Sequence, residues 1–232
     1  MTLAEHIQKV QARIAAAAEQ AGRDPSEVTL VAATKVQTSE TIRAAIAAGI
    51  TVCGENRAQE FTQHWQDGAY EGAKVHFIGH LQKNKLKYLV GKVDLIESVD
   101  SEELIRLIDK RAQNLGIVQD ILIEVNIGGE ASKSGVKPEE VEALVALAAS
   151  LPGVEPRGLM AIPPVAQEPG ANRAVFAAMR QLFIDIKGKT YNNKVNIDCL
   201  SMGMSGDYGV AIEEGATIVR VGTVLFGARD YT

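Results

Sequence analysis

Short apolar runs alternate with amphipathic segments along the whole chain. The runs are nearly continuous in apolar residues, as expected of parallel strands covered on both faces, and they occur at 29–34, 51–54, 75–79, 94–99, 120–126, 157–162, 198–203 and 218–222. Between them, apolar residues recur at helical spacing, as at Val175, Met179, Leu182, Phe183 and Ile186. This alternation predicts an α/β protein built on a parallel sheet.

Eight strands that alternate with helices can close as a barrel or lie in an open, doubly wound sheet. We favour a single (β/α)₈ TIM-type barrel domain over residues 1–232, because there are eight runs and the chain ends just after the last. An extra N-terminal helix is predicted as well. Its apolar positions are separated by polar residues, unlike the core of a signal peptide, and they are Leu3, Ile7, Val10 and Ile14.

The composition argues against two kinds of partner. The chain has 24 basic and 29 acidic residues, a net charge of −5, and no basic stripe of the kind that nucleic-acid binding requires. No apolar run approaches the roughly 20 residues needed to span a membrane. We therefore expect no nucleic-acid partner and no membrane segment. We also expect a monomer.

Cysteine and histidine residues give no sign of a metal site. Cys53 and Cys199 are too few for a disulfide framework or a zinc site, so we expect buried small side chains and a reducing cytoplasm. His76 and His80 straddle the end of a predicted strand, which makes a shared metal improbable. His64 lies in a polar helical stretch, and we expect it to be solvated.

Polar residues gather where the predicted strands end, and in a barrel the active site lies at the carboxyl ends of the strands. Such positions also supply helix caps, so a single polar residue there means little. A ring that includes a lysine and an arginine is more informative. Its members are Lys35, Glu55, Asn56, His80, Ser98, Asp100, Asn126, Ser201, Arg220 and Thr223.

Two cations in this ring are unusual. Lys35 directly follows an apolar strand, so its amine is predicted to face the barrel mouth, where a partly desolvated lysine can form a Schiff base. A solvated surface lysine is the alternative. Arg220 interrupts the apolar run IVRVG, where it either forms a buried ion pair, for example with Asp198, or contacts a ligand from below.

Small residues after the seventh and eighth runs indicate a phosphate site. The segment SMGMSGD at 201–207 and Gly222-Thr223 lie where barrels commonly bind phosphate through backbone N–H groups. Ordinary turn chemistry, with Asp207 as a helix cap, is the alternative. No Walker loop or dinucleotide fingerprint is present.

Seven sequence blocks, in one order, resemble those of the pyridoxal phosphate homeostasis proteins (YggS/PROSC type). The blocks are VAATK ending at Lys35, GEN at 54–56, HFIGHLQKNK at 76–85, EVNIGGEASKSG at 124–135, GLMAI at 158–162, SMGMSGD at 201–207 and VRVGTVLFG at 219–227. The resemblance implies a barrel like the N-terminal domain of bacterial alanine racemase, with pyridoxal 5′-phosphate held as a Schiff base on Lys35. It also implies that Arg220 faces the pyridine nitrogen. The other cofactor-binding residues that it implies are Asn56 and Ser201 near the ring, and Ser205, Gly222 and Thr223 at the phosphate.

An arginine at the ring nitrogen disfavours protonation of that nitrogen, which makes the cofactor a weak electron sink. Racemases with such an arginine place acid–base residues on both faces of the substrate. In alanine racemase the residue opposite the lysine is a tyrosine of a second domain, for which this chain has no residues left. Tyr208 and Tyr231 are the nearby candidates, and neither is clearly placed across from Lys35.

These observations favour a protein of intracellular vitamin B6 homeostasis that stores, buffers or delivers the cofactor without catalytic turnover. Apoenzymes that depend on pyridoxal phosphate are its expected recipients. The alternative is a racemase-like enzyme that completes its site by oligomerising. A third hypothesis is a Schiff-base aldolase that acts on a sugar phosphate with no cofactor.

Overall fold

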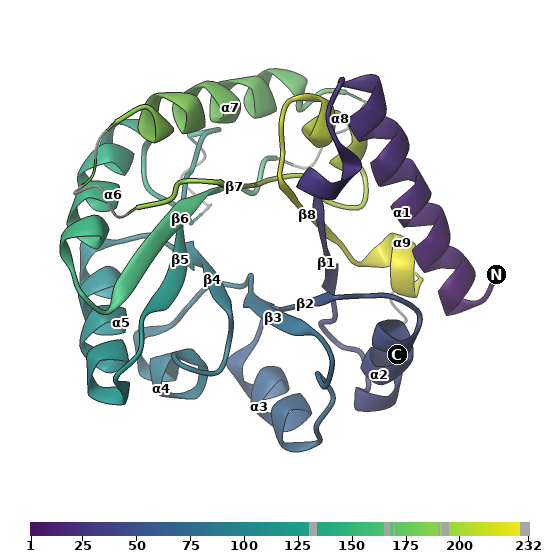
Figure 1. The fold of residues 1–232 in the computed structure, drawn as a ribbon, viewed down its shortest axis with the longest axis horizontal. Coiled ribbons are helices and arrows are strands. Elements are labelled where there is room, and N and C mark those ends of the chain that lie inside the picture. Colours follow the sequence, from purple (N-terminus) through teal and green to yellow (C-terminus); the bar gives the residue numbers. More distant parts are fainter. Residues whose placement is uncertain (130–133, 165–167, 169, 190, 192–194, 228–232) are drawn as a thin grey trace.

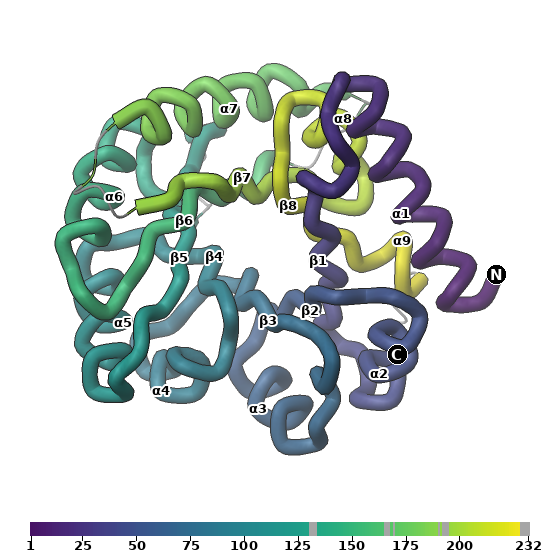
Figure 2. Tube along the Cα trace, viewed as in Figure 1, coloured from purple at the N-terminus to yellow at the C-terminus, as the bar shows by residue number. Residues whose placement is uncertain are grey.

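The computed structural model describes residues 1–129, 134–164, 168, 170–189, 191 and 195–227. Within these residues eight parallel strands close into a barrel in sequence order, and helices cover its outside (Figures 1 and 2). The strands are β1 (Thr29–Ala33), β2 (Val52–Glu55), β3 (Lys74–Phe77), β4 (Leu95–Val99), β5 (Gln119–Glu124), β6 (Val154–Met160), β7 (Cys199–Ser201) and β8 (Ile218–Val221). The predicted α/β barrel is confirmed.

The outer layer consists of α-helices, and single 3₁₀ turns precede β1, α4 and α6. The α-helices are α1 (Leu3–Gln20), α2 (Ser39–Ala47), α3 (Ala58–Gln66), α4 (Leu86–Leu89), α5 (Glu102–Leu115), α6 (Val141–Ser150), α7 (Arg173–Lys187), α8 (Tyr208–Glu213) and α9 (Thr223–Phe226). The 3₁₀ turns are η1 (Pro25–Glu27), η2 (Lys83–Lys85) and η3 (Pro138–Glu140).

The predicted N-terminal helix is α1, and its sequence explains both its start and its packing. Thr2 and Glu5 form a reciprocal capping box, which satisfies backbone N–H groups in the first turn. Ile7, Val10 and Ile14 are buried on one face. That face packs against α8 and α9, so α1 covers the side of the barrel where the last strand meets the first (Figure 1).

Strand β6 begins three residues before its predicted start. The predicted run began at Arg157, and the residue before it, Pro156, cannot donate a ladder hydrogen bond. In the structure Pro156 lies opposite Ile121 of β5, next to a shift in the register of this strand pair. The irregularity accommodates the proline, so the strand extends to Val154.

Closure of the barrel places the first strand next to the last. β1 pairs with β2 on one side and with β8 on the other, and Val31 of β1 is in register with Arg220 of β8. The carboxyl ends of β1 and β8 are therefore neighbours. Part of the barrel interior is occupied by one apolar cluster, consisting of Val31, Ala33, Val52, Ile78, Leu95, Leu122, Met160 and Ile218.

Candidate functional site

A cavity of ≈ 420 Å³ opens at the carboxyl ends of the strands, within the size range of ordinary ligand pockets. Of the predicted site residues, those that line it are Lys35, Asn56, Ser205, Arg220, Gly222 and Thr223. Ser201 does not line it and lies deeper in the barrel, against Arg220. The structure thus brings together, around one cavity, residues from both ends of the sequence.

Lys35 lies in a tight turn that follows β1. The N–H of Gln37 donates to the carbonyl of Thr34 at 3.0 Å, which makes residues 34–37 a β-turn with Lys35 and Val36 at its centre. Val36 has a φ of +61°, and no other non-glycine residue in the described part of the chain has a positive φ. A positive φ at the third position is the mark of a type II turn, where glycine or asparagine is preferred. A β-branched valine in this conformation is strained by about 1–3 kcal/mol.

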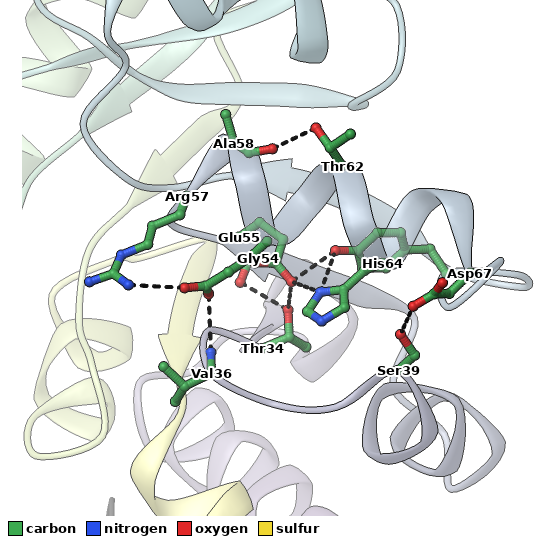
Figure 3. Close-up of polar contacts among 12 residues, drawn as sticks. Thr34, Val36, Ser39, Gly54, Glu55, Arg57, Ala58, Thr62, His64 and Asp67 are labelled. Carbon is green, nitrogen blue, oxygen red and sulfur yellow. Dashed lines mark hydrogen bonds and ion pairs between the residues drawn. The ribbon is translucent and has the colours of Figure 1, made fainter. Parts of the chain in front are cut away.

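A buried polar cluster lies directly behind this turn, between the barrel and α3 (Figure 3). Its centre is Glu55, whose side chain is fully buried. One oxygen of Glu55, Oε1, accepts hydrogen bonds from Thr34 at 2.6 Å and from the Tyr70 hydroxyl at 2.8 Å, and lies 3.2 Å from Nδ1 of His64. The residue before Lys35 is therefore tied to β2 and α3.

His64 is buried, which contradicts the expectation that it would be solvated. The hydrogen bond with Glu55 raises the pKa of His64, against the opposing effect of burial. The sequence did place His64 on a helix, but that helix turns this side chain toward the carboxylate behind the barrel wall.

Asn56 offers the cavity an unused acceptor. Its side-chain oxygen Oδ1 is buried and has no hydrogen-bond partner among the described residues. The backbone of Asn56 is fixed by close approach to Gly79, since a Cβ at Gly79 would lie 2.0 Å from the carbonyl oxygen of Asn56. A buried amide oxygen without a partner is costly, so this group fits a ligand that donates to it.

Arg220 forms the floor of the cavity and is almost fully buried. Its guanidinium donates to the carbonyl of Ala161 at 2.7 Å and to the hydroxyl of Ser201. Burial lowers the pKa of Arg220, while the charge of Glu97 opposes that effect. The suggested pairing with Asp198 is wrong, because Asp198 immediately precedes β7, at the opposite end of the barrel, and pairs there with Arg157 at 2.7 Å.

The carboxylate that accompanies Arg220 is Glu97 of β4, which the sequence analysis did not single out. Ser201 donates to Oε2 of Glu97 at 2.5 Å, and Nδ1 of His76 lies 2.7 Å from Oε1. Burial alone would raise the pKa of Glu97, but the bond with His76 and the charges of His76 and Arg220 outweigh it and lower the pKa. The sequence does contain a signal for a buried charge at this position, since Glu97 interrupts the apolar run LIESV just as Arg220 interrupts IVRVG.

The segment between β7 and α8 forms one wall of the cavity. The hydroxyl of Ser205 accepts a hydrogen bond from the N–H of Gly222 at 3.2 Å, which joins this segment to the end of β8. Asp207 holds the turn closed by accepting from the N–H of Met204 at 2.8 Å. Gly206 borders open space, because a Cβ built there meets nothing within 4 Å.

The remaining sequence expectations concern tyrosines, metals and membranes. Tyr208 is buried at the start of α8 and does not line the cavity, and Tyr231 lies outside the described residues.

Among the residues that the structure describes, no group of three or more His, Cys, Asp or Glu side chains could hold a metal ion. In the same residues, no helix is both long enough and apolar enough to cross a membrane.

Comparison with known proteins gives consistent matches over the whole barrel. A family profile described as "Alanine racemase, N-terminal domain" matches residues 6–230. A protein of Aquifex aeolicus named pyridoxal phosphate homeostasis protein is 47% identical over 231 residues, which is 100% of each chain. An unknown protein from Bifidobacterium adolescentis, known from a crystal structure, is 39% identical with a TM-score of 0.89, over 97% of this chain and 94% of that one. PipY of Synechococcus elongatus, solved with pyridoxal phosphate bound, is 31% identical with a TM-score of 0.83, over 97% of this chain and 100% of that one.

Proposed function

The chain belongs to the family of pyridoxal phosphate homeostasis proteins, and on that premise we propose that it binds pyridoxal 5′-phosphate as a Schiff base on Lys35. In this role it takes part in intracellular vitamin B6 homeostasis, as a carrier without catalytic turnover. When bound, the cofactor supplies a reactive aldehyde and an electron-accepting ring. The observation that carries the proposal is that Lys35, just after β1, and Arg220 of the paired strand β8 border the same cavity.

The residues around the cavity fit such a group. Lys35 supplies the amine, and the unpartnered Oδ1 of Asn56 supplies an acceptor for a donor on the ligand. Gly206 leaves open space beside Ser205, and the backbone at Gly222 and Thr223 begins a short helix, a setting suited to a phosphate. We assign the ring to the region of Asn56, Ser201 and Arg220, and the phosphate to Ser205, Gly222 and Thr223.

The charge on Arg220 argues for binding without catalysis. A guanidinium beside the ring nitrogen disfavours protonation of that nitrogen, and the ring then accepts electrons poorly. Lys35 and Arg220 are the only titratable side chains among the described residues that line the cavity. Acid–base catalysis on two faces of a substrate needs a second proton donor, and such a group typically contributes roughly 10²–10⁴-fold.

The first test is the visible spectrum of the purified protein. We expect a yellow protein that borohydride bleaches, with the label on Lys35 after proteolysis and mass spectrometry. A protein that stays colourless when pyridoxal phosphate is added would remove the proposal and favour the aldolase hypothesis.

The second test separates a carrier from a racemase-like enzyme. The loaded protein is incubated with L-alanine and other amino acids, and the enantiomer ratios are followed by chiral chromatography. A carrier gives at most a stoichiometric spectral change. Multiple turnovers that disappear in Lys35→Ala would instead establish an enzyme.

We further propose that residues 1–232 act as one cofactor-binding domain, as a monomer in the cytoplasm, with apoenzymes that need pyridoxal phosphate as its recipients. Cys53 and Cys199 are free thiols, as is usual in a reducing compartment. Mixing the loaded protein with an apoenzyme tests transfer, because activity of the apoenzyme should appear as the colour leaves the carrier. Sedimentation of the purified protein tests the monomer.

A further inference from the structure

The turn that carries Lys35 has a backbone conformation that its own sequence does not favour. Val36 occupies the third position of the turn with a φ of +61°, a conformation that glycine adopts freely and valine does not. Val36 is also 61% exposed, so packing of its side chain does not account for the conformation. Something outside residues 34–37 must hold the turn.

The contact at Val36 comes from α3. The N–H of Val36 donates to Oε2 of Glu60 at 3.2 Å, while Arg57 donates to the other oxygen, Oε1, also at 3.2 Å (Figure 3). Glu60 therefore bridges the turn to the start of α3. Its side chain is 23% exposed, against 72% for Arg57, so the carboxylate is the more sheltered member of the pair.

The other side of the turn is held by the same part of the chain. Thr34 is fully buried, and its hydroxyl donates to Glu55 at the end of β2. Lys35 thus stands between two fixed points, Thr34 and Val36. Both are bound by glutamates that lie five residues apart, on β2 and on α3.

We propose that Glu60 is a positioning residue, which holds Val36 in the left-handed conformation and so keeps the Lys35 amine directed into the cavity. Without this hydrogen bond Val36 relaxes to a negative φ, and the turn no longer presents Lys35 in the same direction. The statement about the turn is independent of the cofactor. Only its consequence for the amine rests on the proposed function.

The first experiment uses the cofactor-free protein and measures hydrogen exchange of the Val36 amide by NMR. Glu60→Ala should speed this exchange roughly tenfold, the loss expected for a hydrogen bond to a charged group. Glu60→Gln keeps an acceptor oxygen and should stay close to the wild type. Glu40→Ala is the matched control, since Glu40 is likewise paired with an arginine three residues away but lies on α2, outside the turn. Equal exchange in Glu60→Ala and the wild type would overturn the proposal.

The second experiment asks whether the conformation of Val36 is what Glu60 controls. The rate at which added pyridoxal phosphate forms its Schiff base is measured by stopped-flow absorbance. Glu60→Ala should slow it, and Val36→Gly in the same chain should restore it, because glycine needs no external contact to adopt a positive φ. A slow rate that glycine does not restore would show that Glu60 acts in some other way and would overturn the proposal.

The two experiments separate this inference from the proposed function. If the wild type never forms a Schiff base, the cofactor role fails, and hydrogen exchange still decides whether Glu60 holds the turn. Thermal unfolding of each variant, whose melting temperature should stay close to that of the wild type, excludes general unfolding as the cause.

Discussion

Glu97 and Arg220 face each other inside the barrel, with 3.7 Å between Oε2 of the carboxylate and Nη1 of the guanidinium. They come from β4 and β8, which are not neighbours, so their contact crosses the barrel interior. Ser201 of β7 bonds to both side chains. The cation beneath the cavity is therefore balanced by a carboxylate buried within the barrel.

Removing one member of this pair should be more harmful than removing both. Glu97→Leu leaves the buried charge of Arg220 unbalanced, and we expect a loss of about 3–5 kcal/mol in the free energy of unfolding. Glu97→Leu combined with Arg220→Met leaves no unpaired charge and should be less destabilised. Urea denaturation of the cofactor-free variants measures both values. A double variant less stable than Glu97→Leu would contradict this account of the pair.

Lys35→Ala should abolish the visible absorbance of the Schiff base while leaving the fold intact. The reason is that a side chain at the end of a strand, bordering an open cavity, contributes little to the core. Absorbance after addition of pyridoxal phosphate measures the first effect, and far-UV circular dichroism with thermal unfolding measures the second. If the variant unfolds without denaturant, Lys35 has a structural role instead.

Gly79→Ala should destabilise the protein and displace Asn56. The new methyl group would lie 2.0 Å from the carbonyl oxygen of Asn56, which is backbone and has no easy way to move. We expect a loss of about 1–3 kcal/mol, the usual effect of overpacking, together with weaker cofactor binding. Gly206→Ala is the control for stability, because its methyl group enters open space. Equal stability of Gly79→Ala and the wild type would contradict this prediction and would mean that the backbone at Asn56 moves to make room for the methyl group.

The His64–Glu55 contact should make stability depend on pH. The pKa of His64 is raised in the folded state, so protonation stabilises the fold. This contribution is fully present below the unfolded pKa of about 6.5 and is lost as the pH rises through the higher folded value. His64→Gln should therefore cost about 1.5–3 kcal/mol at acid pH and less at alkaline pH. Denaturant titrations from pH 5 to 9 give the difference, and a difference that grows with pH would contradict the assignment.

Much of the fold was predictable because parallel strands covered on both faces are apolar along their whole length. The same reasoning placed Lys35 and Arg220 at one end of the barrel. It failed for Asp198, because the residue that precedes a strand and a residue near the end of the next strand lie at opposite ends of the barrel.

Two features of the site leave little trace in a single sequence. The positive φ of Val36 is imposed by a contact from α3, and no glycine marks the position. The burial of His64 depends on which face of α3 meets the barrel, in a helix whose polar residues lie on both faces. In both cases a tertiary contact determines the conformation or the burial of the residue. Local residue preferences therefore do not predict either feature.

If the proposed function holds, the pairing of β1 with β8 means that the cofactor site forms only after the whole barrel has been synthesised. A growing chain emerges from its N-terminus at about 5–20 residues per second, so Lys35 is available well before β8 has been made. Arg220, Gly222 and Thr223 join it only when the last strand docks against the first. A nascent or truncated chain therefore has the lysine proposed to form the Schiff base but not the cavity around it. Only a completed barrel would then retain the ligand tightly. Ligand held in this way would not expose its aldehyde to partly folded chains.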